Sequence, residues 1–471
     1  MQDAKVKIPG VETALLLALV FCAALGAACS SGAKGGPDGG GGPTDGGVLP
    51  DGGTNPDGGT SARSAFFLPN SYHGAATNLR GTTVAVDASG GTHVAYLDFI
   101  DNVPMYRFCA GACDDASQFT GVDFPPEAGG VSYLSLALDP SGHPRLLWDV
   151  YQGFAYASCD TGCTTAAGWT VTRVEAKGDP GSGSARRFAL DSQGHPRAIF
   201  SSHTDPDVGT YFEACDTDCQ TPSSWSEVKI SDTELSRPSL AIGADGRARF
   251  LALDQSAGRT TPETAGMTYL ECADAACSSL SGVNLPSVNN LQGDLSLQLT
   301  AGDLPRAAVF TGSLDTPDVL DPNAVEYLWC DSACADGANN TWAAANTHLS
   351  VGDSGGALAL ALEGQGRPRL AVKTDQGMAY ASCDTGCESS GGTWTQGTVD
   401  DVTQLATATP PSGCGVVGWV FGDEEGGAGV SIALDPQGNP RLGYDARHLV
   451  LCSGQVETSI EWPRFLGLAA P

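Results

Sequence analysis

The chain from residue 64 onward consists of short hydrophobic runs separated by polar turns. The clearest stretch predicts four successive β-strands, because each run has the length of a strand and each break contains Gly, Pro, Asp or Ser. The predicted strands are Leu136–Asp139, Pro144–Asp149, Phe154–Cys159 and Trp169–Val174.

This four-strand unit recurs along the chain. The segment Leu136–Asp149 reads Leu-Ala-Leu-Asp-Pro-Ser-Gly-His-Pro-Arg-Leu-Leu-Trp-Asp, and similar segments begin at Phe188 and Ile432. Weaker copies begin at Val84, Leu240, Leu297 and Leu360. An aligned basic residue occurs at His93, Arg145, Arg197, Arg249, Arg306, Arg369 and Arg441. Seven such units predict an all-β fold, a seven-bladed β-propeller of four-stranded blades over residues 64–471.

The last unit has two candidates for its outermost strand. One is its own segment Ile460–Phe465, which contains Trp462. The other is Ala65–Pro69, which would pair there and latch the ring. Either pairing removes a free strand edge that would otherwise favour aggregation.

The repeat resembles the sialidase-like and NHL-like propeller units of bacterial extracytoplasmic proteins. The resemblance lies in the Ala-Leu-Asp-x-x-Gly-x-Pro-Arg hairpin and the Tyr-x-x-Cys strand. It implies an architecture and no particular activity, since the sialidase Asp-box, Ser-x-Asp-x-Gly-x-Thr-Trp, occurs in no unit. The recurring acid and arginine, such as Asp139 and Arg145, are expected to bridge their own turn as part of the repeat. The arginine cluster of sialidases lies on the other face, so its role is not carried over.

The first residues have the pattern of an export signal. The apolar run Ala14–Leu25 is too short for a transmembrane helix and suits a signal peptide. The small residues before Cys29 resemble the lipobox of bacterial lipoproteins, which implies a signal peptide over residues 1–28 and lipidation of Cys29. An ordinarily cleaved secretory signal and an uncleaved anchor are the alternatives. Ser30 in place of Asp favours the outer membrane by the rule of that family, on the periplasmic side or at the cell surface.

Residues 29–63 are rich in Gly, Pro and Asp, and no core can form from them. We therefore expect a flexible tether between the membrane anchor and the propeller.

The cysteines outside the signal, apart from Cys29, amount to two per predicted blade. An even number, local spacing and an export signal predict disulfides in an oxidising compartment. The local pairs are Cys109/Cys113, Cys159/Cys163, Cys215/Cys219, Cys272/Cys277, Cys330/Cys334 and Cys383/Cys387, and the remaining two predict a Cys414–Cys452 bond. In each local pair the second cysteine follows a short turn after the third strand. Zinc is not expected, because each pair lies in a different blade and four thiolates cannot converge.

Composition supports the β-rich interpretation and limits the partners. The chain has 62 Gly and 28 Pro with only 17% charged residues, which is a turn-rich mix rather than a helical one. Its formal net charge of −30 would repel a phosphate backbone, so nucleic-acid binding is excluded. Trp148 and Tyr156 stand at strand positions and are expected in the core between blades.

Propeller geometry predicts where a binding site would lie. The turns after the first and third strands of each unit share one face with the local disulfides, and the longer loops after the second strand lie on the opposite face. Variable loops on a regular scaffold are where binding is usually found. The candidate ligand-binding residues on that face are His203, Asp205, Asp207, Arg259, Asp315, Asp318, Asp321, Asp445, Arg447 and His448.

These patterns favour a binding or scaffolding module for a glycan or another surface protein, monomeric and held at the membrane by lipid. A carbohydrate-active hydrolase or lyase that uses the variable loop face is the alternative. No catalytic residue, metal ligand or cofactor follows from the residues. Gly352–Gly356 resembles the nucleophile segment of trypsin-like proteases, but the accompanying His and Asp segments are missing.

Overall fold

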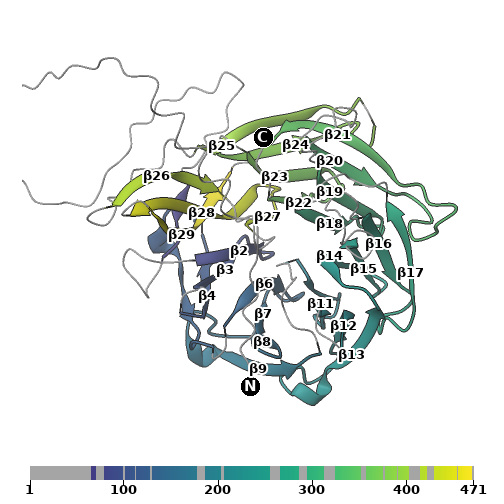
Figure 1. Cartoon of the computed structure of the whole chain (residues 1–471), viewed down its shortest axis with the longest axis horizontal. Coiled ribbons are helices and arrows are strands. Elements are labelled where there is room, and N and C mark those ends of the chain that lie inside the picture. Colours follow the sequence, from purple (N-terminus) through teal and green to yellow (C-terminus); the bar gives the residue numbers. More distant parts are fainter. Residues whose placement is uncertain are drawn as a thin grey trace, which may run out of the picture. The chain divides into compact units, whose positions relative to one another are not determined.

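The computed structural model describes residues 65–69, 79–98, 101–111, 113–127, 130–177, 186–202, 206–254, 266–285, 294–311, 324–351, 357–374, 377–389, 391–401, 414–421, 429–452 and 455–468. Within them, seven antiparallel sheets form a ring (Figure 1). Six sheets have four strands paired in chain order, and the seventh combines strands from both ends of the chain. The predicted seven-bladed β-propeller is therefore confirmed. We call the strands of a blade a to d, from the centre of the ring outward.

The strands follow the predicted units closely. Blades one and two contain β2 (Leu79–Val86), β3 (Thr92–Asp98), β4 (Val103–Cys109), β5 (Thr120–Asp123), β6 (Ser132–Leu138), β7 (Pro144–Val150), β8 (Gly153–Cys159) and β9 (Trp169–Glu175). Blades three and four contain β10 (Phe188–Leu190), β11 (Pro196–Ser202), β12 (Gly209–Ala214), β13 (Ser226–Ser231), β14 (Leu235–Ile242), β15 (Ala248–Asp254), β16 (Gly266–Cys272) and β17 (Leu280–Leu285).

The remaining three blades complete the ring, and the longest strands lie in blade seven. Blades five and six contain β18 (Leu295–Leu299), β19 (Pro305–Thr311), β20 (Ala324–Trp329), β21 (Ala343–Ser350), β22 (Leu358–Leu362), β23 (Pro368–Thr374), β24 (Gly377–Cys383) and β25 (Trp394–Asp401). Blade seven contains β27 (Val430–Leu434), β28 (Pro440–Cys452), β29 (Gln455–Gly467) and β1 (Phe66–Phe67), with β26 (Cys414–Phe421) as an extra strand.

Burial along a blade follows its position in the ring. Every residue of β8, the c strand of blade two, is buried, whereas the outer strand β9 alternates between buried and exposed positions. Inner strands are covered on both faces by neighbouring blades, so they carry continuous hydrophobic runs. Outer strands face solvent on one side and alternate.

The hydrophobic core is divided among the interfaces between blades. Each pair of adjacent blades shares one cluster of buried side chains in the described part of the chain. Trp148 lies in the cluster between blades one and two, and Tyr156 lies in the cluster between blades two and three. Both residues therefore occupy the predicted core, which explains why aromatic side chains recur at these strand positions.

Blade seven is closed by the beginning of the chain. Phe66 pairs with Phe465 and Phe67 with Arg464, so β1 is the d strand of this blade. The segment Ile460–Phe465 lies in β29, the c strand, which excludes it as the outermost strand. Between the two candidates, the ring is thus latched by Ala65–Pro69.

The six local cysteine pairs are all disulfides, as predicted. The bonds are Cys109–Cys113, Cys159–Cys163, Cys215–Cys219, Cys272–Cys277, Cys330–Cys334 and Cys383–Cys387. Five of them span a sequence separation of 4, and Cys272–Cys277 spans 5. Each bond therefore closes the c–d connection of its own blade.

Several of the second cysteines of these pairs are buried although they follow a polar turn. Cys113, Cys277 and Cys387 have exposed fractions of 1%, 2% and 9%. Each lies with its strand-c partner in a hydrophobic cluster between two blades. The reason is that a disulfide is apolar and folds the turn back over the blade interface, so these sulfur atoms extend the core and are not available to a ligand.

The last blade differs from the others in its cysteines. Cys452 ends β28, the 13-residue b strand, whereas the first cysteine of each local pair lies at the end of a c strand. Cys414 on β26 is the register partner of Cys452, which brings the two backbones side by side. Their side chains lie outside the described residues, so the Cys414–Cys452 bond stays a prediction.

Replacing both Cys159 and Cys163 by serine is expected to lower the free energy of unfolding by about 2 kcal/mol, because this bond closes a short loop and restricts the unfolded chain only locally. The same double replacement at Cys215 and Cys219 is the matched case, since both bonds span a sequence separation of 4. Urea unfolding measures both changes. Unchanged stability in both variants would contradict a stabilising role for these disulfides.

Several expectations concern residues that the structure does not describe. The signal peptide of residues 1–28, the lipidated Cys29 and the tether of residues 29–63 all lie outside the described residues. Among the residues described, no helix is long and apolar enough to cross a membrane.

Candidate functional site

In five blades the recurring arginine forms a clasp, in which its guanidinium joins the start of strand b to the end of strand c of the same blade. In blade two, Arg145 Nη1 donates to the carbonyl oxygens of Pro144 at 3.2 Å and Cys159 at 2.8 Å. Its Nη2 pairs with Asp139 at 2.7 Å and Asp160 at 2.6 Å. The guanidinium therefore holds the a–b turn against the end of strand c, which confirms that the pair of Asp139 and Arg145 belongs to the repeat.

The same clasp occurs in four further blades. Each arginine donates to the carbonyl of the preceding proline and to a carbonyl at the end of the third strand. These arginines and their third-strand partners are Arg197 with Cys215, Arg306 with Cys330, Arg369 with Cys383, and Arg441 with Leu468.

Blade four departs from this arrangement. Gly243 stands where the other turns carry an acid or Thr300, and Ala273 follows Cys272 where most blades have Asp. Arg249 instead forms a two-pronged pair with Asp245, with Nη1 to Oδ1 at 3.0 Å and Nη2 to Oδ2 at 2.9 Å. A Cβ atom at Gly243 would lie 2.1 Å from Arg249 Nη1, so this placement of the arginine requires glycine.

A second arginine is added beside the first. Arg247 occupies the turn position that His143 and His195 hold in blades two and three. Its Nε donates to Asp245 Oδ2 at 2.6 Å, and its Nη1 pairs with Glu271 Oε1 at 2.9 Å. The Arg247 side chain is 36% exposed, whereas that of Arg249 is 4% exposed, so Arg247 is the arginine available to a ligand.

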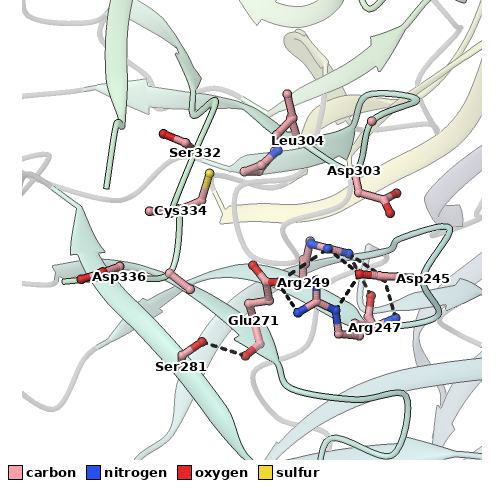
Figure 2. A pocket seen from close by; sticks show the side chains of 14 residues that line it. Asp245, Arg247, Arg249, Glu271, Ser281, Asp303, Leu304, Ser332, Cys334 and Asp336 are labelled. Atoms are coloured by element: carbon pink, nitrogen blue, oxygen red, sulfur yellow. Dashed lines mark hydrogen bonds and ion pairs between the residues drawn. The ribbon is translucent and has the colours of Figure 1, made fainter. Parts of the chain in front are cut away.

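These residues form one wall of a pocket between blades four and five (Figure 2). The opposite wall comes from the a–b turn and the c–d loop of blade five, where Leu304, Ser332 and Cys334 lie across from the arginine pair. The pocket has a volume of about 700 Å³, within the usual range for small-molecule sites. Asp303 bridges its two sides, because its Oδ1 accepts a hydrogen bond of 2.8 Å from the backbone N–H of Ala244.

The charges of the pocket are mostly committed to ion pairs. Partial burial would raise the pKa of Asp245, but hydrogen bonds from Arg249 and Arg247 outweigh it and hold that pKa well below the usual range. Asp245 is therefore ionised at neutral pH and cannot donate a proton. The lining contains four carboxylates and two guanidiniums, so the pocket is net negative.

The centre of the ring offers less room. Arg186 crosses it from blade three and donates to Asp294 at 2.6 Å in blade five and to the Val430 carbonyl at 2.7 Å in blade seven, with a further bond to the Leu358 carbonyl in blade six. The cavity beside Arg186 measures about 170 Å³, which is below the usual size of a ligand site. The interblade pocket is therefore the better candidate of the two.

The residues predicted on the variable loop face are only partly described. Asp207 lies in the b–c connection of blade three, where its backbone carbonyl accepts a hydrogen bond of 2.9 Å from the Tyr211 hydroxyl. Arg447 and His448 lie within β28, opposite Val420 and Trp419 of β26, and their side chains are not described. The predicted residues outside the described ranges are His203, Asp205, Arg259, Asp315, Asp318 and Asp321.

Asp445 is not available to a ligand. It was expected at an exposed strand end, but it lies in the middle of β28 and is only 2% exposed. Its carboxylate accepts hydrogen bonds from the backbone N–H groups of Gly81 at 2.8 Å and Thr82 at 3.2 Å, and another from the Thr82 hydroxyl. Asp445 therefore joins blade seven to blade one where the ring closes.

Sequence analysis did not single out the residues of the interblade pocket. A signal was present, since blade four has Gly243 where every other unit has a side-chain acceptor, and Ala273 where most blades have Asp. Treating the repeat as a background and searching for departures from it would have pointed to this blade.

Comparison with known proteins adds fold-level similarity. No family model and no curated protein matches the sequence. Solved structures that resemble the chain include the polysaccharide lyase Uly1, at 12% identity and a TM-score of 0.43, covering 84% of this chain and 91% of that one. A GH93 α-L-arabinofuranosidase of Fusarium graminearum has 12% identity and a TM-score of 0.42 over 72% of this chain and 92% of its own.

A third similar structure is the NanB sialidase of Streptococcus pneumoniae, at 10% identity and a TM-score of 0.42, covering 86% of this chain and 70% of that one. At these identities and scores the similarity bears on no site. The assignment of the chain to the seven-bladed β-propellers rests on its own sheet order and ring of blades.

Proposed function

We propose that this protein is a lipid-anchored, extracytoplasmic binding module that holds a neutral glycan in the pocket between blades four and five. The observation that carries the proposal is the pairing of Arg247 with Asp245 and Glu271 at the mouth of a pocket of about 700 Å³. Guanidinium donors and carboxylate acceptors side by side match adjacent sugar hydroxyls, because each hydroxyl both donates and accepts.

The charge of the pocket selects among glycans. Four carboxylates outnumber two guanidiniums in its lining, and the whole chain carries −30. A sugar that bears a carboxylate or sulfate would be repelled on approach. The proposed ligand is therefore a neutral saccharide rather than an acidic one.

Binding is favoured over hydrolysis by the protonation of the pocket. A general acid needs a carboxyl whose pKa is raised toward neutral, and the ion pairs at Asp245 have the opposite effect. The charged groups of this pocket are suited to holding a ligand in one orientation.

The anchoring part of the proposal comes from the N-terminal sequence and the disulfides. Six described disulfides are typical of an oxidising compartment, and the export pattern before Cys29 supports the same location. Lipidation at Cys29, a tether over residues 29–63 and display at the outer membrane complete the proposal.

A glycan array probed with residues 64–471, produced oxidised, tests the binding function. Saturable binding to neutral saccharides is expected. Arg247→Ala should weaken it by about 10- to 100-fold, since a charge-assisted hydrogen bond contributes about 1.5–3 kcal/mol.

Arg367→Ala is the matched control. Arg367 holds the same turn position in blade six, pairs with Glu363 and Asp384, and is also 36% exposed. It should leave glycan binding unchanged. No binding across the array, or equal losses in the two variants, would refute the proposed site.

A further inference from the structure

A second departure from the repeat lies on the rim, where blade three meets blade two. Glu213 on β12 and Glu227 on β13 are register partners, so their side chains point to the same face of the blade. Glu213 is only 2% exposed. Two carboxyl groups are thus held together, one of them almost fully removed from water.

The other blades show what this position normally holds. The residue aligned with Glu213 lies two positions before the first cysteine of the local disulfide, and its register partner lies on strand d. None of the aligned pairs in the other five blades with a local disulfide contains a carboxylate. These pairs are Arg107/Gly121, Ala157/Val171, Leu270/Gly282, Leu328/Ala344 and Ala381/Gln396. The glutamate pair is therefore no requirement of the fold, and burying it is costly unless its charge is compensated.

Other groups of the protein only partly compensate for the burial of the Glu213 carboxyl. Burial, followed by the negative charge of Glu227, raises the pKa of Glu213 to about 9, so its carboxyl keeps a proton at neutral pH. Glu213 Oε1 is buried and has no hydrogen-bond partner among the described residues. A buried carboxyl oxygen without a donor marks a place where a further partner would be favourable.

Lys177 forms its hydrogen bond and its ion pair with Glu227 rather than with Glu213. Its backbone N–H donates to Glu227 Oε2 at 2.9 Å, and its Nζ lies 3.4 Å from Glu227 Oε1. The Lys177 side chain is 61% exposed, so its ammonium can move away at little cost. Arg173, the other cation of this region, is already paired with Glu127.

The pair opens into a groove of about 630 Å³. Trp225 and Ser223 line this groove together with Glu213 and the charged residues Glu227, Glu175, Lys177 and Arg173. Solvent therefore reaches the glutamate pair from one side, and a small ion can enter without unfolding the blade.

We propose that Glu213 and Glu227 bind a hard divalent cation of the calcium type, which takes the place of the proton held between them. Carboxylate oxygens are the ligands that Ca²⁺ prefers, and water from the groove completes its coordination. Binding converts Glu213 to its carboxylate and releases one proton, while Lys177 turns toward solvent. The two ligands are 14 residues apart on neighbouring strands, so the site has no short sequence motif by which it could be recognised.

Terbium luminescence tests this site directly, because Tb³⁺ occupies calcium sites and is excited by a nearby tryptophan, here Trp225. The probe is the chain from Gly58 onward, which contains all seven blades. Terbium emission that calcium displaces is expected, with a calcium affinity in the 10⁻⁴–10⁻³ M range of extracellular modules. Calcium should also raise the melting temperature.

Glu213→Gln is the decisive variant. Glutamine has the shape of the protonated glutamate, so the blade should fold, while calcium affinity should fall at least tenfold. The double variant Glu213→Ala with Glu227→Val reproduces the pair Ala157 and Val171 of blade two and should lose both the terbium signal and the calcium-dependent rise in melting temperature.

Asp216→Asn is the control for binding elsewhere. Asp216 is 72% exposed and belongs to a cluster with Asp191 and His195 that could also hold an ion. It should leave the terbium signal unchanged. Calcium binding that survives in Glu213→Gln, or is lost in Asp216→Asn, would overturn the proposal, as would the absence of calcium-displaceable emission in the wild type. None of these readouts depends on glycan binding.

Discussion

Replacing Arg187 by alanine is expected to lower the free energy of unfolding by about 3–5 kcal/mol. Arg187 and Asp149 form an ion pair in which both side chains are only 1% exposed. The guanidinium also lies over the Phe200 ring, 4.6 Å from its centroid, and joins blade three to blade two. Alanine would leave the Asp149 carboxylate buried without this cation, which is the costly situation for a charge in a low-dielectric interior.

Urea unfolding followed by tryptophan fluorescence measures this loss. Lys229→Ala is the control, because Lys229 pairs with Asp232 at the surface, with side chains 38% and 94% exposed, and should cost less than about 1 kcal/mol. The double variant Arg187→Met with Asp149→Leu should recover much of the stability, because no charge is then left buried. A single variant as stable as the wild type would show that the pair contributes nothing.

Removing residues 65–69 is expected to open the ring and to cost about 2–5 kcal/mol from the loss of buried Leu68 alone. Leu68 is 3% exposed and belongs to the cluster that joins blades seven and one. Its N–H donates to the Pro463 carbonyl at 2.9 Å, and Phe67 lies under the Arg464 guanidinium. The truncation also exposes the edge of β29, so self-association should increase.

The comparison needs two chains, one beginning at residue 64 and one beginning at residue 70. The longer chain keeps β1 and should melt like a chain that begins at Gly58. The shorter chain should melt at a lower temperature and scatter more light. Equal melting temperatures for the two would mean that Ala65–Pro69 does not latch the propeller.

Much of the fold could be predicted from the repeat. One reason is that the clasp formed by the recurring arginine lies within a single unit. Arg145, Arg197, Arg369 and Arg441 each follow a proline and pair with an acid at the end of strand a, so the pattern acid-x-x-Gly-x-Pro-Arg appears in the sequence of these four blades. The four-residue separation of most cysteine pairs records the c–d loop in the same way. Features that depend on residues within one turn or loop can therefore be predicted from the sequence of that segment.

The candidate sites were less predictable, because their residues meet across blades or strands. Asp445 was expected on the loop face, yet it accepts hydrogen bonds from backbone N–H groups of blade one. Asp149, near the end of the b strand of blade two, pairs in the same way with Arg187 of the next blade. Their exposure depended on neighbours far away in the sequence, and no spacing rule records such neighbours.

The sequence by itself determined the all-β class, the number of blades, the strand order within six of them and the six local disulfides, because each of these depends on residues within one unit. Only the tertiary structure decided that Ala65–Pro69 closes blade seven, that Asp445 is buried, that a pocket opens between blades four and five, and that Glu213 lies against Glu227. These features depend on contacts between separate strands and blades, and such contacts are set by the packing of the whole ring.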